Sequence, residues 1–325
     1  MIRVAIALAL SALLWCAAQA QFSVGPKYGD GFGFSALPSA GAPPGYTGPG
    51  DIITSGAMMW WGMRCYNNAY AGNVADITDS ATGNTTGTRL QCSSGTVSAL
   101  VSGSACTFVT GNACSSLATT CATACNVLTL YDQSGALKCA GAIACTVTNA
   151  ANADRPTVTV SCQNSHPCMV FNGSAQQMLS AANLASTQAQ PIYMSFVAKR
   201  TGNFTSFAGV AVPGSGGSPY GGFANAANQI TCYAGNTASV AATDNAVHAA
   251  QIQFNSTTSV FYVDGASTTG QNCGTGSASG AQPTVGNSGF GQLMTGQVME
   301  VGFWAGSNTG SNSTMNSNQH TYWSF

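Results

Sequence analysis

The apolar residues of this chain fall in short runs, and a turn signal ends each run. One run at residues 127–131 stops at Asp132-Gln-Ser-Gly135, and another at 168–171 stops at Asn172-Gly173. Strands need only roughly four to eight residues, so runs of this length separated by Gly, Asn and Asp are typical of strands. The pattern predicts an antiparallel β-sandwich. Strands are expected at residues 127–131, 157–161, 168–171, 192–198, 248–254, 259–263 and 297–304.

Two local patterns refine this prediction. The strands at 248–254 and 259–263 form a hairpin, and Asp264-Gly265 turns the chain again. Residues 55–66 predict one short N-terminal helix, because Ser55 can cap its start and large apolar groups fall on one side. In that helix Trp60 and Trp61 are expected in the core. Loops are expected at 82–88, 213–218 and 306–317, and a short closing segment at 313–323.

The beginning of the chain reads as a targeting segment followed by a leader. Residues 1–20 contain Arg3, a nearly unbroken apolar stretch and the small residues of Ala18-Gln19-Ala20, as in a secretory signal peptide. Residues 21–47 are rich in Gly and Pro and are expected to be an exposed leader, which leaves 48–325 as the sandwich domain. The apolar run is too short to cross a bilayer, so we expect a secreted or periplasmic protein without membrane insertion.

Cysteine usage agrees with export. Of the 13 cysteines, Cys16 falls in the signal segment, and the remaining even number indicates disulfides formed in an oxidising compartment. Cys139 with Cys145 and Cys162 with Cys168 are close enough to staple local hairpins. Cys232 and Cys273 are expected to close longer loops, and the full connectivity stays open. Histidines are not clustered with cysteines, so we expect no metal site and no cofactor.

The chain carries very few charges. Charged residues make up 5% of it, against roughly a quarter in ordinary domains, and the formal net charge is −1. This balance excludes a basic nucleic-acid footprint and a polybasic membrane patch. A surface of Ser, Thr, Asn, Gln and Gly suits neutral hydrogen-bonding partners such as polysaccharide. The alternative is a secreted protein whose surface is uncharged and has no such partner.

Carboxylates, the working groups of most glycosidases, are scarce. The chain has nine acidic residues, and Glu300 is the only glutamate. Glu300 lies in an alternating strand, where it is either an acid on the inner face or the partner of Arg64, Arg89 or Arg155. Asp132 follows a strand and either faces a cleft or caps backbone amides. These two residues are the candidates for catalysis.

Several motifs carry a resemblance to known proteins. Phe261-Tyr-Val-Asp-Gly265 and the closing segment 296–304 resemble the second half of a concanavalin A-like or laminin-G-like jelly roll. Gly48-Pro-Gly-Asp-Ile52 and Leu130-Tyr-Asp-Gln-Ser-Gly135 resemble elements of the α-L-arabinofuranosidase B catalytic domain. The resemblance covers roughly residues 48–325, and the Tyr-Asp-Gln-Ser-Gly element is its most specific part.

That family implies a retaining glycoside hydrolase acting on arabinan or arabinoxylan, with two carboxyl groups about 5 Å apart. Its nucleophile is a glutamate in a stretch that corresponds to residues 222–231, and no acidic residue lies between Arg200 and Thr243. Its acid/base is an aspartate in a turn that corresponds to Gly286-Asn287-Ser288, and an Asn side chain has no titrating proton. Both catalytic positions therefore lack a carboxylate.

Three hypotheses follow. The first is a glycan-binding or catalytically degenerate relative of the family, in which aromatic rings stack on sugars and amides bind hydroxyls. The second is an active arabinofuranosidase that uses displaced carboxylates, and the third is a structural or adhesive surface protein that self-associates through edge strands. The glycan-binding candidates are Tyr131, Asp132, Gln133, Tyr220, Asn228, Tyr233 and Asn287.

Overall fold

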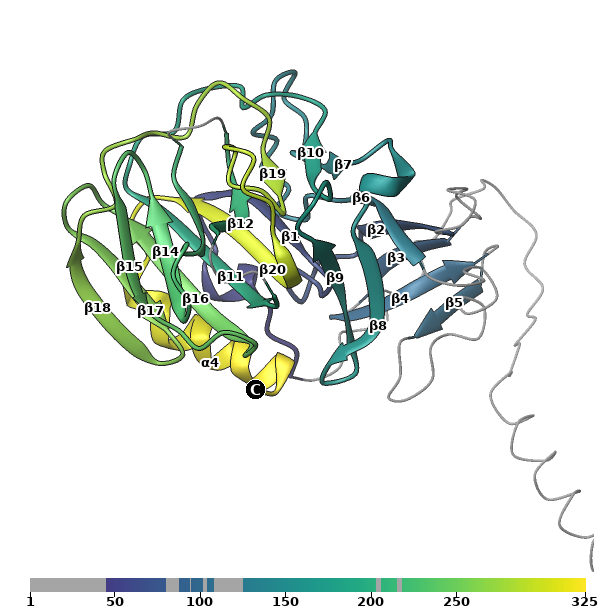
Figure 1. The fold of residues 1–325 in the computed structure, drawn as a ribbon. Coiled ribbons are helices and arrows are strands. Elements are labelled where there is room, and N and C mark those ends of the chain that lie inside the picture. Colours follow the sequence, from purple (N-terminus) through teal and green to yellow (C-terminus); the bar gives the residue numbers. More distant parts are fainter. Residues whose placement is uncertain are drawn as a thin grey trace, which may run out of the picture. The chain divides into compact units, whose positions relative to one another are not determined.

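Antiparallel strands build almost all of the described part of the chain, as the short apolar runs predict (Figure 1). The structure is a computed structural model, and it describes residues 45–79, 88–93, 95–101, 104–107, 125–202, 206–214 and 218–325. The expected signal peptide at 1–20, residues 21–44 of the expected leader and residues 82–87 of an expected loop lie outside the described residues. All described residues belong to the unit Ala40–Phe325.

A first sheet contains the longest strands. Its central strand β20 pairs with β11 on one side and with β1 and part of β9 on the other, and the sheet continues outward from β11. Its strands, in spatial order, are β1 (Ala57–Gly62), β20 (Thr295–Ala305), β11 (Ile192–Arg200), β16 (His248–Phe254), β17 (Ser259–Val263) and β18 (Ala266–Gln271).

A second sheet packs against the first. Gly221 marks the contact, because a Cβ atom there would lie 2.8 Å from both Ile252 Cδ1 and Met194 Sδ of the first sheet. The strands of the second sheet, in spatial order, are β7 (Val147–Thr148), β10 (Met178–Ser180), β19 (Thr284–Val285), β12 (Ala208–Val212), β13 (Tyr220–Phe223), β14 (Gln229–Tyr233) and β15 (Thr237–Ala241). The two sheets enclose the main hydrophobic core and confirm the predicted sandwich.

A further run of strands extends the sandwich from β9. It contains β9 (His166–Asn172), β8 (Thr157–Gln163), β6 (Cys125–Leu130), β2 (Asn73–Asp79), β3 (Thr88–Ser93), β4 (Thr96–Val101) and β5 (Ser104–Thr107). Helical segments are few: α2 (Pro49–Ile52), α4 (Asn312–Trp323) and single 3₁₀ turns at Asn152–Asp154 and Thr309–Ser311. None of the helices in the described ranges is long and apolar enough to cross a membrane.

Both faces of the first sheet are buried along its strands β1, β20, β11 and β16, and β11 shows how. Met194 and Phe196 point into the core between the sheets. Tyr193, on the opposite face, packs with Trp304 and with Met315 of α4. A strand covered on both sides reads as a continuous apolar run and not as an alternating pattern.

The helix predicted at residues 55–66 is wrong, because this segment forms strand β1. Met58, Met59, Trp60 and Trp61 are all buried: Trp60 packs in the cluster of Tyr193, Trp304 and Met315, and the other three pack in the main core. A short apolar run buried on both faces cannot be distinguished from a buried helix by its periodicity. The prediction that both tryptophans lie in the core is confirmed.

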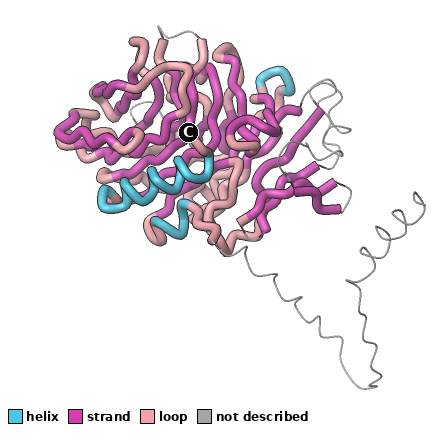
Figure 2. Tube along the Cα trace, turned by 90° about the horizontal axis from the view of Figure 1, so that it is seen from below, coloured by secondary structure: helices cyan, strands magenta, loops and turns pink. Residues whose placement is uncertain are grey.

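The one helix of more than a single turn in the described residues is α4, which covers the outer face of the first sheet along β16 and β17 (Figures 1 and 2). It begins at Asn312, inside the segment 306–317 that was expected to be a loop. Its residues are mostly Ser, Thr, Asn and Gln, so the sequence has no apolar stripe that would predict an amphipathic helix here. Instead, amide side chains hold it: Asn316 donates to the carbonyl oxygen of Ala249 (3.2 Å), and Gln251 donates to Gln319 (2.6 Å).

Glu300 lies at the centre of the interface between α4 and the first sheet. Its carboxylate is fully buried and forms an ion pair with Arg64, which is also fully buried. It also accepts hydrogen bonds from Gln319 Nε2 (2.7 Å) and Trp323 Nε1 (3.0 Å) of α4. Arg64 donates in turn to Asn318 Oδ1 (2.9 Å). Of the three arginines considered as partners of Glu300, the structure selects Arg64.

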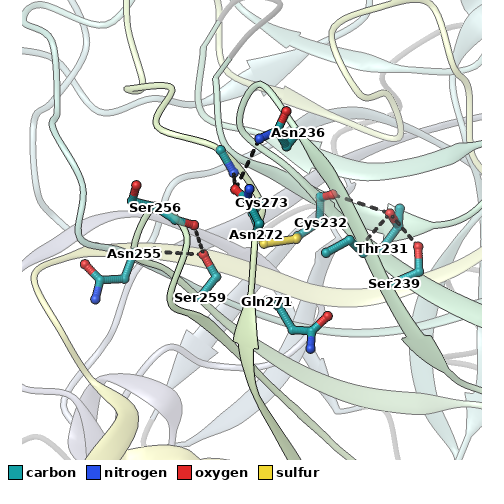
Figure 3. The surroundings of a disulfide bond; sticks show 12 residues. Thr231, Cys232, Asn236, Ser239, Asn255, Ser256, Ser259, Gln271, Asn272 and Cys273 are labelled. Carbon is teal, nitrogen blue, oxygen red and sulfur yellow. Dashed lines mark hydrogen bonds between the residues drawn. A yellow bond between two sulfur atoms is a disulfide. The ribbon is translucent and has the colours of Figure 1, made fainter.

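Four disulfides join described cysteines. Cys139–Cys145 and Cys162–Cys168 are the two local pairs expected from their spacing. The other two join Cys65 to Cys92 and Cys232 to Cys273. The Cys232–Cys273 bond ties β14 of the second sheet to the segment that follows β18 of the first, among Ser, Thr, Asn and Gln side chains (Figure 3).

His248 is the first residue of β16, and its ring lies between two hydrogen-bond acceptors. Its Nδ1 lies 2.5 Å from Asp264 Oδ2, and its Nε2 lies 2.6 Å from the carbonyl oxygen of Thr243. Both ring nitrogens can donate only when the imidazole is protonated. Burial opposes the charged form, but the hydrogen bonds to Asp264 and Thr243 and the charges of Asp264 and Asp244 outweigh it, so the pKa of His248 is raised. His320 of α4 approaches the same carboxylate at 3.5 Å.

Replacing Glu300 with Gln should destabilise the fold strongly. The substitution leaves the Arg64 charge buried without a counter-ion, which typically costs about 3–5 kcal/mol. The measurement is the free energy of unfolding in denaturant. Arg89→Gln is the control, since the Arg89–Asp76 pair is partly exposed and is worth at most about 1 kcal/mol. Equal effects of the two substitutions would contradict a central role for Glu300.

The stabilisation contributed by His248 should depend on pH. Because its pKa is higher in the folded state than the ordinary value, the contribution is fully present below about pH 6.5 and is lost as the pH rises through the folded-state pKa. His248→Gln should therefore destabilise the protein more at pH 5 than at pH 9, measured as the difference in unfolding free energy from the wild type. A difference that is the same at both pH values would refute a charged His248.

Candidate functional site

A single loop, residues 286–294, covers the outer face of the second sheet. Gly286 donates to the carbonyl oxygen of Val210 (2.8 Å), and the carbonyl oxygen of Gln292 accepts from Gly209 (3.1 Å). The approach needs a glycine on β12, because a Cβ atom at Gly209 would lie 2.2 Å from the backbone nitrogen of Ser288. The lack of a side chain at Gly209 thus lets the loop rest directly on the strand.

A groove of about 480 Å³ opens beside this loop. Its polar side chains are amides and hydroxyls, from Asn225, Gln292, Ser206 and Thr295, and none of the described lining residues is titratable. The remaining lining residues are Gly173, Phe207, Ala208, Gly291 and Leu293. Asn225 comes from the segment 222–231 and Gln292 from the loop that begins at Gly286. The turn between β13 and β14 and the 286–294 loop therefore meet at this groove.

Three aromatic rings lie next to the groove. Tyr220 and Tyr233 stand opposite each other on β13 and β14, and their rings stack at 5.4 Å between centroids. Phe290 of the loop contacts Tyr233 edge-on at 5.3 Å and Tyr220 at 6.2 Å. The hydroxyl of Tyr220 donates to Gln292 Oε1 (3.2 Å), which links this aromatic cluster to the groove. Burial, together with the neighbouring Tyr233, raises the pKa of Tyr220 to about 12, so its hydroxyl stays protonated.

A second hollow, of about 540 Å³, lies between α4 and the segment around Tyr46. Ser313, Ser317 and Thr321 line it from the helix. Gly45, Tyr46 and Thr47 line the opposite side of this hollow, and Gly45 is the first described residue of the chain. The groove beside the 286–294 loop is the better candidate, because it lies beside Tyr220 and Tyr233, two of the predicted glycan-binding residues.

Three of the predicted site residues gather around the loop. Tyr220 and Tyr233 belong to the aromatic cluster. Asn287 is nearly buried at the start of the loop, where its amide donates to Gln177 Oε1 (2.5 Å) and its Oδ1 accepts from the backbone of Gly289 (3.1 Å). Asn287 therefore shapes the loop that carries Phe290 and Gln292.

Asn228 lies apart from the groove lining, in the turn between β13 and β14. Its φ of 58° is in the left-handed region that Asn tolerates, and its Oδ1 accepts from the backbone nitrogen of Asp244 (2.9 Å). Asp244 forms an ion pair with Arg200, which also donates to the carbonyl oxygen of Ala226 (3.1 Å). Asn228 thus helps to hold the turn that carries Asn225.

The Tyr-Asp-Gln-Ser-Gly element serves the fold. Asp132 is buried and accepts from the backbone nitrogens of Trp60 (3.0 Å) and Cys145 (3.0 Å) and from Ser134 Oγ (2.7 Å). Gln133 accepts from the backbone nitrogen of Tyr66 (3.0 Å) and donates to two carbonyl oxygens in the segment 62–64. Burial raises the pKa of Asp132, and these hydrogen bonds oppose the shift. Both side chains clamp β1 and the chain that follows it.

Tyr131 lies at the partly exposed Arg89–Asp76 ion pair. Its hydroxyl donates to Asp76 Oδ2 (2.7 Å) and accepts from Arg89 (3.0 Å), whose guanidinium lies 5.4 Å from the ring centroid. Burial, the hydrogen bond to Asp76 and its charge raise the pKa of Tyr131 to about 12. The ring is therefore packed against a cation and is not grouped with Tyr220 and Tyr233.

Carboxylates of the described chain are mostly engaged within the fold. Asp51 accepts from the backbone nitrogens of Gly48 and Asn68, and Asp264 accepts from Ala249 as well as binding His248. Asp76, Asp132, Asp244 and Glu300 have the partners given above. Within the described ranges, no group of three or more His, Cys, Asp or Glu residues is placed to hold a metal ion.

Phe290, Gln292 and Asn225 were not singled out in the sequence. Phe290 stands in a Gly-rich stretch, and the amides are two among many. The pairing of β13 with β14 and the packing of the loop on Gly209 bring them together. A partial signal was present: Asn225 lies within the segment 222–231, whereas Phe290 and Gln292 lie outside the turn 286–288.

The fold is similar to that of solved α-L-arabinofuranosidase structures. A mutant of a GH54 α-L-arabinofuranosidase soaked with 4-nitrophenyl α-L-arabinofuranoside superposes with a TM-score of 0.62 at 14% identity. An arabinofuranosidase complexed with arabinofuranosyl-α-1,2-xylobiose superposes with a TM-score of 0.61, also at 14% identity. In both cases the match covers 84% of this chain and 64% of the other. No family model and no curated protein matches the sequence. At this identity the likeness establishes a shared glycoside hydrolase-like sandwich fold.

Gly209→Ala should displace the 286–294 loop. The added Cβ atom would meet the backbone of Ser288, which cannot move without shifting the loop, so we expect a loss of about 1–3 kcal/mol in unfolding free energy. Hydrogen exchange measured by mass spectrometry should become faster in residues 286–294. Gly310→Ala is the control, since a Cβ atom there has no neighbour within 4 Å. Unchanged exchange in the loop would show that it does not depend on Gly209.

Proposed function

We propose that this chain is a secreted or periplasmic, non-catalytic glycan-binding protein, and that the groove beside the 286–294 loop binds neutral sugar units. The observation that carries the proposal is the lining of the groove. It combines amide and hydroxyl side chains with apolar walls and contains no titratable group. Neutral sugars present hydroxyls that both donate and accept, and Asn and Gln amides can do the same.

The size and position of the groove support this proposal. A volume of about 480 Å³ falls within the range of small-molecule sites, and its few polar groups converge between apolar surfaces. The fold is shared with enzymes crystallised with arabinofuranose-containing ligands. The disulfides of the described chain are typical of an oxidising compartment and so favour export, where polysaccharides are found.

Retaining hydrolysis is the alternative, and the positions of the carboxylates count against it. That reaction requires one carboxylate nucleophile and one carboxylic acid roughly 5 Å apart at the sugar. The described groove lining has neither group. Glu300, the earlier candidate, lies under α4 in its ion pair with Arg64. Asp132 is engaged with β1.

Affinity electrophoresis in gels containing arabinan or arabinoxylan tests the proposal. The wild type should be retarded, and Gln292→Ala and Asn225→Ala should each weaken binding by roughly tenfold, because each removes hydrogen bonds worth about 1 kcal/mol or more to sugar hydroxyls. Gln282→Ala and Asn183→Ala, at exposed positions outside the groove, are the matched controls.

Two outcomes would contradict the proposal. The first is a wild-type protein that no neutral polysaccharide retards. The second is release of 4-nitrophenol from 4-nitrophenyl α-L-arabinofuranoside by the wild type, which would restore the hydrolase alternative.

A further inference from the structure

Phe290 is a large aromatic side chain left in solvent. It is 48% exposed, and the other large hydrophobic residues exposed to a similar degree in the described chain are aliphatic, Leu137 and Ile143. A single exposed apolar residue is ordinary in itself. Phe290 differs from the other two because its ring is fixed in place.

Two sets of contacts fix the Phe290 ring. Tyr233 meets it at an interplanar angle of 88°, and Tyr220 meets it at 61°. The backbone nitrogen of Phe290 donates to Ser288 Oγ (3.2 Å), which holds the turn that presents the ring. The Cys232–Cys273 disulfide anchors β14 one residue before Tyr233 (Figure 3). A ring ordered in this way loses little conformational freedom when a ligand covers it.

The ring is also continuous with the groove. Gly291 follows Phe290 directly and lines the groove, as do Gln292 and Leu293. Gln292 accepts the hydrogen bond from Tyr220, against which Phe290 packs. The Phe290 ring therefore lies directly beside the loop residues that line the groove.

We infer that Phe290 forms a second sugar-binding position, so that the ligand is an oligosaccharide or polysaccharide held through at least two consecutive neutral units. One unit places its hydroxyls against the amides of the groove, and the next rests its apolar face on the Phe290 ring. This inference rests on the proposed function. It differs from removal or capture of a single terminal sugar, for which a platform outside the groove has no use.

Calorimetric titration with arabinose and with arabinan-derived oligosaccharides of increasing length tests the inference. Phe290→Ala should weaken binding of the longer oligosaccharides by about tenfold, and it should leave any affinity for the single sugar unchanged. Phe290→Trp should retain binding, because the stacking surface is kept. Leu137→Ala removes an equally exposed apolar side chain elsewhere and is the matched control. Thermal unfolding of each variant verifies that the fold is retained.

The outcomes separate the two proposals. If Phe290→Ala binds longer oligosaccharides as tightly as the wild type while Gln292→Ala loses them, the second position is refuted and the groove stands. If Phe290→Ala weakens the single sugar and the longer oligosaccharides equally, the ring belongs to the groove itself and the inference is again refuted. If the wild type binds none of these sugars or polysaccharides, the proposed function fails, and the inference fails with it.

Discussion

The buried ion pair between Glu300 and Arg64 is the interaction on which the rest of the structure depends. Burying two charges costs free energy, which their mutual attraction and further hydrogen bonds must offset. Here the interacting groups lie on β20, in the chain after β1 and on α4. The pair therefore holds together three segments that are far apart in the sequence. It also fixes α4 on the outer face of the first sheet. The long strands β11 and β20 are therefore buried along nearly all of their length.

The second sheet is covered in a different way. Its inner face belongs to the same core, but a loop that rests on the backbone at Gly209 covers part of its outer face. This loop leaves a groove beside it, and amide and hydroxyl side chains form part of the groove lining. The structure thus divides its two sheets between two roles. The first sheet and α4 form the most deeply buried part, and the second sheet carries the 286–294 loop and the groove beside it.

The scarcity of acidic residues has a physical interpretation in this arrangement. Most of the described carboxylates cap backbone amides or neutralise arginine or histidine, so the few acids of the chain are used in holding the fold. The described lining of the groove carries amides and hydroxyls and no carboxylate. Amides can bind a sugar hydroxyl but cannot transfer a proton at ordinary pH, which is why a binding role fits the chemistry of the groove better than hydrolysis.

The sequence alone determined the class of fold. The short apolar runs, the hairpin around residues 255–258 and the two local disulfides needed only neighbouring residues to be recognised, and the structure contains them all. Tertiary structure decided what local patterns cannot encode. Residues 57–62 form a strand because β20 lies beside them, and 312–323 form a helix because amides of the sheet hold it. The use of Glu300 in an ion pair, and the meeting of Asn225, Gln292 and Phe290, depend on contacts between segments distant in sequence. Periodicity reports the conformation of a segment, whereas the environment of a side chain is set by whatever the fold packs against it.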